Sequence, residues 1–517
     1  MRRYIGPTHE NTGDIKKDGT LQNIESLITN GVIGRQARIT IVFRQYPTSG
    51  APSDCGTTKR VEKITLNGRD LATTGNSARL KANDDGTWTK VAFLVPVEWV
   101  KFPKEPGMWN TQTQTASPAV SPRGNSITIT FARGDCVCTQ IDWASLEIRA
   151  MSPVILVHGI GGGPTTFTSF EMAQSLEDAK LIADRSVHQL PSHQTIEEDG
   201  NNLRTRVPLI ARDLYGADLY HLVCHSKGGL DSRRFLESTN GVGSPELSPV
   251  SLITMGTPHM GSPVADFVYA FGEACRMYKV VALDTEFEVG THSIAIAADR
   301  FLIKSGNPSL RPGWSDLRTG EFDRQQRKNI SVLRSMNNNM LFYAIGTSAD
   351  IDGSSSISGE NERRGFTDLG AAAETGISIA SMFTFSVIGS IIFNEIVGTV
   401  LDTALDRIYQ ICGRYAAFEV LESGTRDVNG NSVTGGLLRG VRRWSGTQPN
   451  DLVVPQMSSS GINTPFVTEV CQNNRTFLTG GIGGDHSYLL RREIADIYVI
   501  PRLREADTLY GGMKPWP

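Results

Sequence analysis

The stretch Asp218-Leu-Tyr-His-Leu-Val-Cys-His-Ser-Lys-Gly-Gly-Leu-Asp231 decides the fold of this chain. Its apolar, β-branched half ends at Ser226, and a helical pattern of polar and apolar residues follows through Leu236. The stretch therefore predicts a strand, a sharp turn with a serine at its corner, and a helix. Such a turn needs small residues two positions before and after the serine. Gly228 meets this need well and Cys224 less well; the alternative is a surface turn whose serine has no role.

The length and composition of the chain limit what it can be. Its 517 residues exceed what one compact core accommodates, which indicates two or three domains. With 39% hydrophobic and 20% charged residues, a net charge of -3 and no basic block, it is typical of a globular protein without a nucleic-acid partner. No apolar segment follows the basic residues at the N-terminus, so no signal peptide is visible. Either the protein stays inside the cell or this chain starts after its leader.

The chain contains seven cysteines, and their spacing indicates no metal site. One residue separates Cys136 from Cys138, whereas paired zinc ligands are separated by about two to four residues. We therefore expect neither a metal nor another cofactor. An odd count leaves at least one thiol unpaired, which we expect to be Cys224, and Cys55 is a candidate for a disulfide with Cys136 or Cys138.

Residues 1–150 predict an N-terminal antiparallel β-sandwich domain. From 37 to 148 the hydrophobic period is two, and short strands alternate with turn dipeptides such as Asn67-Gly68. This accessory domain resembles immunoglobulin-like or carbohydrate-binding modules in texture only. The segment from 107 to 125 is rich in Thr, Ser, Pro and Gln and predicts a long loop. Four tryptophans belong either to the core or to a ligand-stacking face: Trp88, Trp99, Trp109 and Trp143.

Residues 151–517 predict an α/β domain with a mostly parallel, doubly wound sheet. The run Val154-Ile-Leu-Val157 is entirely apolar, as in a strand that is buried on both faces, and further strands and helices alternate after it. Two stretches, about 263–339 and 353–447, interrupt this alternation. The second contains the apolar segment 377–400, which we expect to form a helical cap or lid. A buried helix and a membrane span are the alternatives.

A serine hydroxyl is a weak nucleophile at neutral pH, so Ser226 needs a base, an acid that orients the base, and donors for the oxyanion. In α/β-hydrolases these residues follow the order serine, acid, histidine. Most of the nine histidines precede the serine or lie too close after it, whereas His486 lies in a late glycine-rich loop before a final helix. Asp451, just before an apolar run, is the favoured acid. Asp350 and Asp352, directly after a predicted strand, are the alternatives.

Two main-chain N–H groups are expected to bind the oxyanion. One belongs to Lys227, directly after the serine, and the other to Ile160, in the glycine-rich loop after the first strand of the α/β domain. This loop, His158-Gly-Ile-Gly-Gly-Gly163, lacks the glycine spacing of a dinucleotide-binding loop and has no P-loop lysine. We therefore expect no nucleotide there.

These motifs together resemble those of bacterial lipases and esterases of the α/β-hydrolase superfamily, over about 153–261, 315–347 and 450–492. The matching pieces are the His-Gly loop, the His-Ser-x-Gly-Gly turn, Gly256-Thr-Pro-His-Met-Gly-Ser262, the Asn-Asp loop and the late histidine. The resemblance implies a catalytic triad and an oxyanion hole at the positions that match: Ser226, Asp451 and His486, with Ile160 and Lys227. The chain departs from the usual residues at Cys224, Lys227 and Leu452.

The resemblance implies a carboxylic ester hydrolase that works through an acyl-enzyme intermediate. The apolar insertions favour a hydrophobic substrate, namely a lipidic, aromatic or polymeric ester. We expect a monomer that contacts a lipid or polymer surface through its cap or its N-terminal domain, and the resemblance favours a secreted or cell-envelope location. The alternatives are an acyltransferase with the same residues and a non-catalytic protein that binds a surface or membrane.

Overall fold

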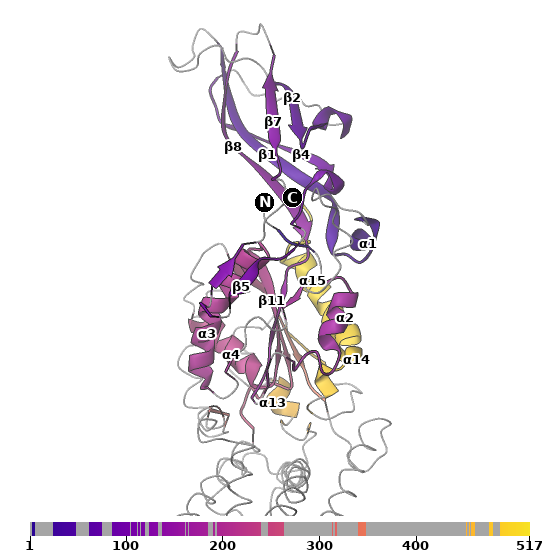
Figure 1. Cartoon of the computed structure of the whole chain (residues 1–517), viewed down its shortest axis with the longest axis vertical. Helices are drawn as coiled ribbons and strands as arrows, with labels where there is room; N and C mark the ends of the chain where they lie inside the picture. The colour runs from indigo at the N-terminus through magenta and orange to yellow at the C-terminus, as the bar shows by residue number, and fades with distance from the viewer. Residues whose placement is uncertain are drawn as a thin grey trace, which may run out of the picture.

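The computed structural model contains two kinds of β-sheet in different parts of the chain (Figure 1). Antiparallel sheets from the N-terminal part lie at one end of the molecule, and a parallel sheet with helices on both faces lies next to them. The structure describes residues 3–5, 24–47, 61–74, 85–103, 105–110, 112–113, 115–118, 124–132, 137–160, 162–163, 165–184, 190–191, 194–238, 247–262, 313, 316–317, 340–347, 451, 454, 456–460, 475–478, 486 and 488–516.

The N-terminal part forms the expected antiparallel sandwich. Its two sheets pair, in order, β4 (Thr89–Pro96), β1 (Ile33–Pro47) and β8 (Val137–Ala150), and β3 (Arg69–Asp70), β2 (Val61–Leu66) and β7 (Ile127–Phe131). Alternate residues of β1, from Ala37 to Phe43, are fully buried and share one apolar core with Ile64 and Leu66 of β2. The period of two that is visible in the sequence therefore corresponds to one inward face of each sheet. Short helical segments flank these strands: α1 (Ile24–Thr29), η2 (Leu71–Thr74) and η3 (Val97–Trp99).

The parallel sheet confirms the α/β prediction. Its six strands pair in the order β10 (Ala183–Asp184), β9 (Val154–Val157), β11 (Leu219–His225), β12 (Ser248–Met255), β13 (Leu341–Ile345) and β14 (Arg475–Leu478). All five pairings are parallel. From β9 the chain first moves to one side, to β10, and then crosses back to β11 and continues outward on the other side. The strand order therefore reverses between β9 and β11.

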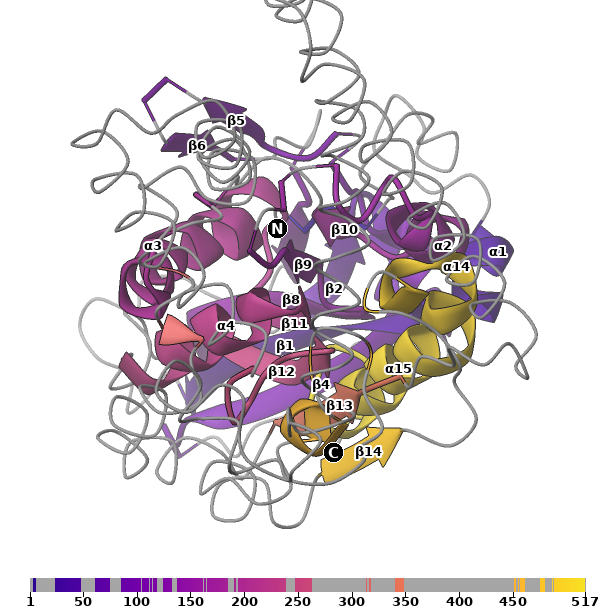
Figure 2. The ribbon, with the colours of Figure 1, turned by 90° about the horizontal axis from the view of Figure 1, so that it is seen from below.

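Helices cover both faces of this sheet, as Figure 2 shows from below. One face packs against α3 (Ile196–Pro208), the π-helical segment η4 (Leu209–Leu214) and α4 (Lys227–Ser238). The other packs against α2 (Met172–Asp178) and the continuous helical run of α14 (Arg492–Ile494), η10 (Ala495–Val499) and α15 (Ile500–Leu509). Two short segments, α13 (Gln456–Ser460) and η9 (Tyr488–Leu490), lie near the end of the chain. The doubly wound fold is thus as expected.

Several local predictions differ from the structure. A short hairpin, β5 (Met108–Asn110) and β6 (Thr115–Ser117), forms where we expected a loop, because Trp109 packs against the core of the parallel sheet and the amide of Gly107 donates to the carbonyl of Leu214. The sequence pattern predicts a helix from about 201 to 213, whereas helix α3 begins at Ile196, because Thr195 and Glu198 form a capping box.

The four tryptophans do not form one ligand-stacking face. Trp99 lies in the core of the sandwich and Trp109 packs on the α/β part. Trp88 and Trp143 are 45% and 43% exposed, and the guanidinium of Arg44 lies 4.4 Å from the ring centroid of Trp88. The core position is thus confirmed for Trp99, and the alternative of one face built from all four is not what the structure shows.

The boundary at residue 150 stays a prediction, although pairing changes from antiparallel to parallel between β8 and β9. Of the two predicted cap insertions, the structure describes only residues 313 and 316–317, and the apolar segment 377–400 lies outside the described residues. Within the described part, no helix is long and apolar enough to cross a membrane.

A buried carboxyl group on β10 predicts a pH-dependent stability. Burial raises the pKa of Asp184 from 3.8 to about 7, although Tyr215 donates a hydrogen bond of 2.9 Å to it. Between these two pH values the group is ionised in the unfolded chain and protonated in the folded protein. The free energy of unfolding therefore decreases as the pH rises, by up to about 4 kcal/mol in total.

We expect Asp184→Asn to remove this contribution, because an asparagine oxygen still accepts from Tyr215 but does not ionise. Urea unfolding at pH 4.5 and pH 7.5 tests this. The variant should gain stability over the wild type at the higher pH. A difference between the two proteins that does not change with pH contradicts the prediction.

Candidate active site

The candidate site lies at the carboxyl ends of β9 and β11, where the strand order reverses. Loops that leave neighbouring strands in opposite directions open a crevice at such a point, which is where α/β proteins bind ligands. The loop after β9 contains Gly159 and Ile160, and the turn after β11 contains Ser226. The sheet therefore brings the predicted serine and the predicted oxyanion loop together.

Ser226 occupies a strained turn between β11 and α4. Its φ is +55°, a left-handed conformation that non-glycine residues rarely adopt, and its main-chain N–H donates to the carbonyl of Met255 at 2.9 Å. A Cβ at Gly228 would lie only 2.4 Å from the carbonyl oxygen of Val157, so only glycine fits two residues after the serine. Cys224, two residues before it, is accommodated in the core, where its Sγ lies 3.1 Å from the hydroxyl of Ser232.

The loop after β9 passes directly over the serine. A Cβ at Gly159 would lie 2.5 Å from the Cβ of Ser226. No hydrogen bond within the described part of the chain uses the main-chain N–H of Ile160 or of Lys227, the first residue of α4. The first N–H groups of a helix have no partner within it. Two unused donors therefore flank the serine, as an oxyanion site requires.

His486 is held by Asp451 from two sides. Its Nδ1 donates to Oδ2 of Asp451 at 2.7 Å, and its main-chain N–H donates to the carbonyl of Asp451 at 2.9 Å. Asp451 is fully buried, and its Oδ1 accepts from the main-chain N–H of Val454. Because Nδ1 carries the proton, Nε2 of the neutral ring is left as an acceptor. Nε2 has no hydrogen-bond partner among the described residues.

His225 and Gly256 position His486 beside the turn that contains Ser226. Nε2 of His225 donates to the main-chain carbonyl of His486 at 3.0 Å, and the two rings lie 4.6 Å apart. Gly256 has a φ of +57°, and a Cβ there would lie 2.8 Å from Cε1 of His486. His225 directly precedes Ser226. Gly256 directly follows Met255, whose carbonyl accepts from the main-chain N–H of Ser226. The imidazole therefore lies next to the serine turn.

Burial keeps the neighbouring histidines neutral. It lowers the pKa of His225 to about 3, with a further contribution from His486. It also lowers the pKa of His158, whose Nδ1 donates to the carbonyl of Gly159, and it lowers the pKa of His259 well below its usual value. Because of their lowered pKa, these three rings are weaker proton acceptors than an ordinary histidine.

A second Ser-His-Asp arrangement lies in the interior. Nδ1 of His221 is 2.8 Å from Oγ of Ser251, and its Nε2 is 3.0 Å from Oδ2 of Asp507. All three side chains are fully buried, and Asp507 also accepts from Ser152 and from the main-chain N–H of Gly512. Burial opposes the ionisation of Asp507, but His221 and Ser152 hold its pKa below its usual value. Since it is fully buried, this arrangement has a structural role and joins the segment before β9 to β11, β12 and α15.

The alternative acids, the metal-binding side chains and the cysteines are only partly covered by the described residues. Asp350 and Asp352 lie outside the described residues. The described residues contain no group of His, Cys, Asp or Glu side chains placed to hold a metal ion. Cys224 is unpaired and buried, as expected, and burial raises its pKa to about 12. Cys138 forms a disulfide with a partner outside the described residues, so Cys55 as its partner stays a prediction.

Two supporting residues were missed by the sequence reasoning. Only the main-chain N–H of Lys227 was assigned a role from the sequence, whereas the structure buries its side chain between Asp199 and Asp231. His225 was set aside as a base because it precedes the serine, although its position at the end of β11 marks it as a neighbour of the site. The i to i+4 spacing of Lys227 and Asp231 on a predicted helix was the available signal for the first.

Comparisons with known proteins give only distant similarity. No model of a known protein family matches the chain, and no curated protein matches it. Among solved structures, a Bacillus licheniformis lipase (BlEst2) is 15% identical, with 68% of this chain and 92% of that chain covered and a TM-score of 0.35. The Legionella pneumophila phospholipase PlaB is 17% identical (40% and 42% covered, TM-score 0.27), and a thermostable Bacillus coagulans carboxyl esterase is 16% identical (38% and 71%, 0.22). The structure is thus distantly similar to those of bacterial lipases and esterases.

Proposed function

We propose that the chain is a carboxylic ester hydrolase with Ser226 as its nucleophile, His486 as its base and Asp451 as the acid that orients the base. One observation carries the proposal. Ser226 lies in a strained turn, at the point where the strand order of the parallel sheet reverses. Beside this turn lies a histidine whose Nδ1 is hydrogen-bonded to a buried carboxylate. This is the set of groups that converts a weak hydroxyl into a nucleophile.

The reaction uses the free nitrogen of the imidazole. Nε2 of His486 takes the proton of Ser226, and Oγ attacks the ester carbonyl to form a tetrahedral oxyanion. The main-chain N–H groups of Ile160 and Lys227 bind that oxyanion. His486 then gives the proton to the leaving alcohol, an acyl-enzyme remains, and water releases the acid by the same steps. Neutral His225 beside the ring adds no second positive charge to the imidazolium that forms.

The proposed substrate is a hydrophobic ester. The support is the apolar character of the segment 377–400 in an insertion next to the α/β fold in sequence. An alcohol acceptor in the assay separates hydrolysis from acyl transfer, because a transferase forms the new ester in preference to the free acid. Assays with p-nitrophenyl esters of increasing chain length then define the acyl group.

A fluorophosphonate probe tests the proposed nucleophile on the intact chain. We expect stoichiometric labelling, with the probe on the peptide that contains Ser226. Ser251 is an internal control, because it has a histidine at 2.8 Å but is fully buried. No labelling of the folded protein, or labelling at Ser251 rather than Ser226, contradicts the proposal.

A further inference from the structure

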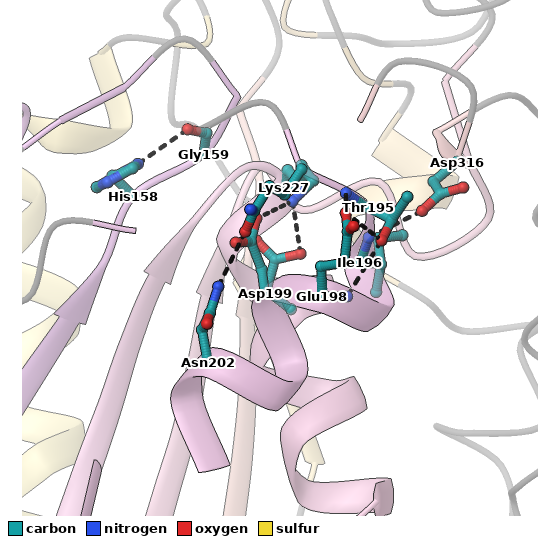
Figure 3. Close-up of polar contacts among 11 residues, drawn as sticks. His158, Gly159, Thr195, Ile196, Glu198, Asp199, Asn202, Lys227 and Asp316 are labelled. Atoms are coloured by element: carbon teal, nitrogen blue, oxygen red, sulfur yellow. Dashed lines mark hydrogen bonds and ion pairs between the residues drawn. The ribbon is translucent and has the colours of Figure 1, made fainter. Parts of the chain in front are cut away.

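The side chain of Lys227 has no part in the proposed reaction. Its main-chain N–H is a proposed oxyanion donor, yet its side chain extends into the interface of α3 and α4 and is almost fully buried. There Nζ lies 2.7 Å from Oδ2 of Asp199 on α3 (Figure 3). It also lies 2.8 Å from Oδ1 of Asp231 on α4. The terminal nitrogen of a residue next to the nucleophile is therefore held by two helices.

The acidic partner on α3 is held rigidly. The helix begins with the capping box of Thr195 and Glu198, and Asp316 accepts from the main-chain N–H of Ile196 at 2.8 Å, as Figure 3 shows. Gly200 then lets α3 approach α4 closely, since a Cβ there would lie 2.7 Å from Cγ of Arg234. Asp199 is thus placed by its helix, independently of Lys227.

The ammonium of Lys227 keeps its charge although it is buried. Burial alone would lower the pKa of Lys227, but the charges of Asp231 and Asp199 outweigh it and hold this pKa above its usual value. Burial raises the pKa of Asp231 to about 8. The charge of Lys227 opposes this rise, and the ammonium stays charged and bound to both acidic side chains.

Stability alone does not explain this arrangement. Apolar residues of similar volume stabilise a protein as well as a buried ion pair does, because the pair loses its hydration. A buried pair instead permits one geometry and excludes others. Here the fixed geometry belongs to the residue whose N–H must point at a developing charge, where small displacements reduce the rate.

We propose that Asp199 and Asp231 are positioning residues, which act through the Lys227 side chain to hold the Lys227 main-chain N–H toward the oxyanion of the substrate. This inference rests on the proposed ester hydrolysis.

The test compares three variants of the full chain on a p-nitrophenyl ester, with active sites titrated by a fluorophosphonate. Asp199→Ala removes the anchor on α3 and leaves Lys227 with Asp231. Asp199→Asn keeps an oxygen that accepts from Nζ. Glu197→Ala is the matched control, because Glu197 also joins α3 to α4, through Arg234 at 3.1 Å, but on the exposed side.

We expect Asp199→Ala to lower kcat about 10-fold, with KM little changed, and to weaken a boronic acid inhibitor by the same factor, since both depend on the oxyanion donors. Asp199→Asn should stay within about threefold of the wild type and Glu197→Ala should match it. If Asp199→Ala keeps the wild-type kcat per titrated site and only unfolds at a lower temperature, or if Asp199→Asn is as impaired as Asp199→Ala, the positioning role is wrong. A wild type without ester turnover or labelling instead contradicts the proposed function itself.

Discussion

Ser226→Ala is expected to lower kcat for ester hydrolysis by about 10⁶-fold and to abolish fluorophosphonate labelling, because no other group of the site supplies the attacking oxygen. KM should change little, since the hydroxyl is small and the alanine Cβ keeps the shape of the turn. The measurement is p-nitrophenyl ester turnover by both proteins, corrected for spontaneous hydrolysis. A variant with more than a hundredth of the wild-type rate contradicts the assignment.

Ser226→Gly separates the catalytic loss from the strain of the turn. Glycine adopts a φ of +55° without cost, so this variant should be as inactive as the alanine variant but more stable than it by about 1 to 2 kcal/mol. Urea unfolding of the two inactive proteins measures the difference. Equal stabilities contradict the view that the elbow stores strain.

Asp451→Asn is expected to lower kcat by about 10⁴-fold while the protein stays folded. The asparagine oxygen can keep the hydrogen bond from Val454, which directs its NH₂ group toward Nδ1 of His486. The ring must then accept at Nδ1 and carry its proton on Nε2. That tautomer cannot take a proton from Ser226, so the serine loses its base.

Asp350→Asn and Asp352→Asn are the matched controls for this prediction, because these residues follow β13 and were the alternative acids. Both controls should keep close to the wild-type kcat. If one of them falls by several orders of magnitude and Asp451→Asn does not, the orienting acid has been assigned to the wrong loop. Thermal unfolding of all three proteins shows whether any loss comes from misfolding.

Local patterns predicted the frame of the site well. An apolar run, a turn residue and a helical period are short-range signals, so the strand at 154–157 and the strand and helix around Ser226 could be read directly. The glycines of the site follow the same logic. Gly228 is required by contacts with β9, but the geometry of the turn already demands a small residue at that position.

The features that could not be predicted from the sequence depend on contacts between residues far apart in the chain. β14 was not predicted because its four residues carry little pattern, and it is placed by pairing with β13. The hairpin β5–β6 is positioned by packing against the core of the parallel sheet. The residues of that core are distant in sequence, so the sequence around the hairpin does not reveal this contact. The partner of the Lys227 ammonium on α3 lies 28 residues away, so its pairing depends on how two helices pack.

The buried group around Asp507 has a consequence for how the chain folds during synthesis. Its partners Ser152 and His221 precede it by 355 and 286 residues. They therefore leave the ribosome long before the carboxylate that binds them. Until then, β11 and the segment before β9 carry polar groups without this partner at positions that are later interior. Contacts between residues so far apart in sequence form late, and the incompletely folded chain exposes apolar surface until they form. We expect nascent chains that end before Asp507 to depend on chaperones, and completed chains to be released from them.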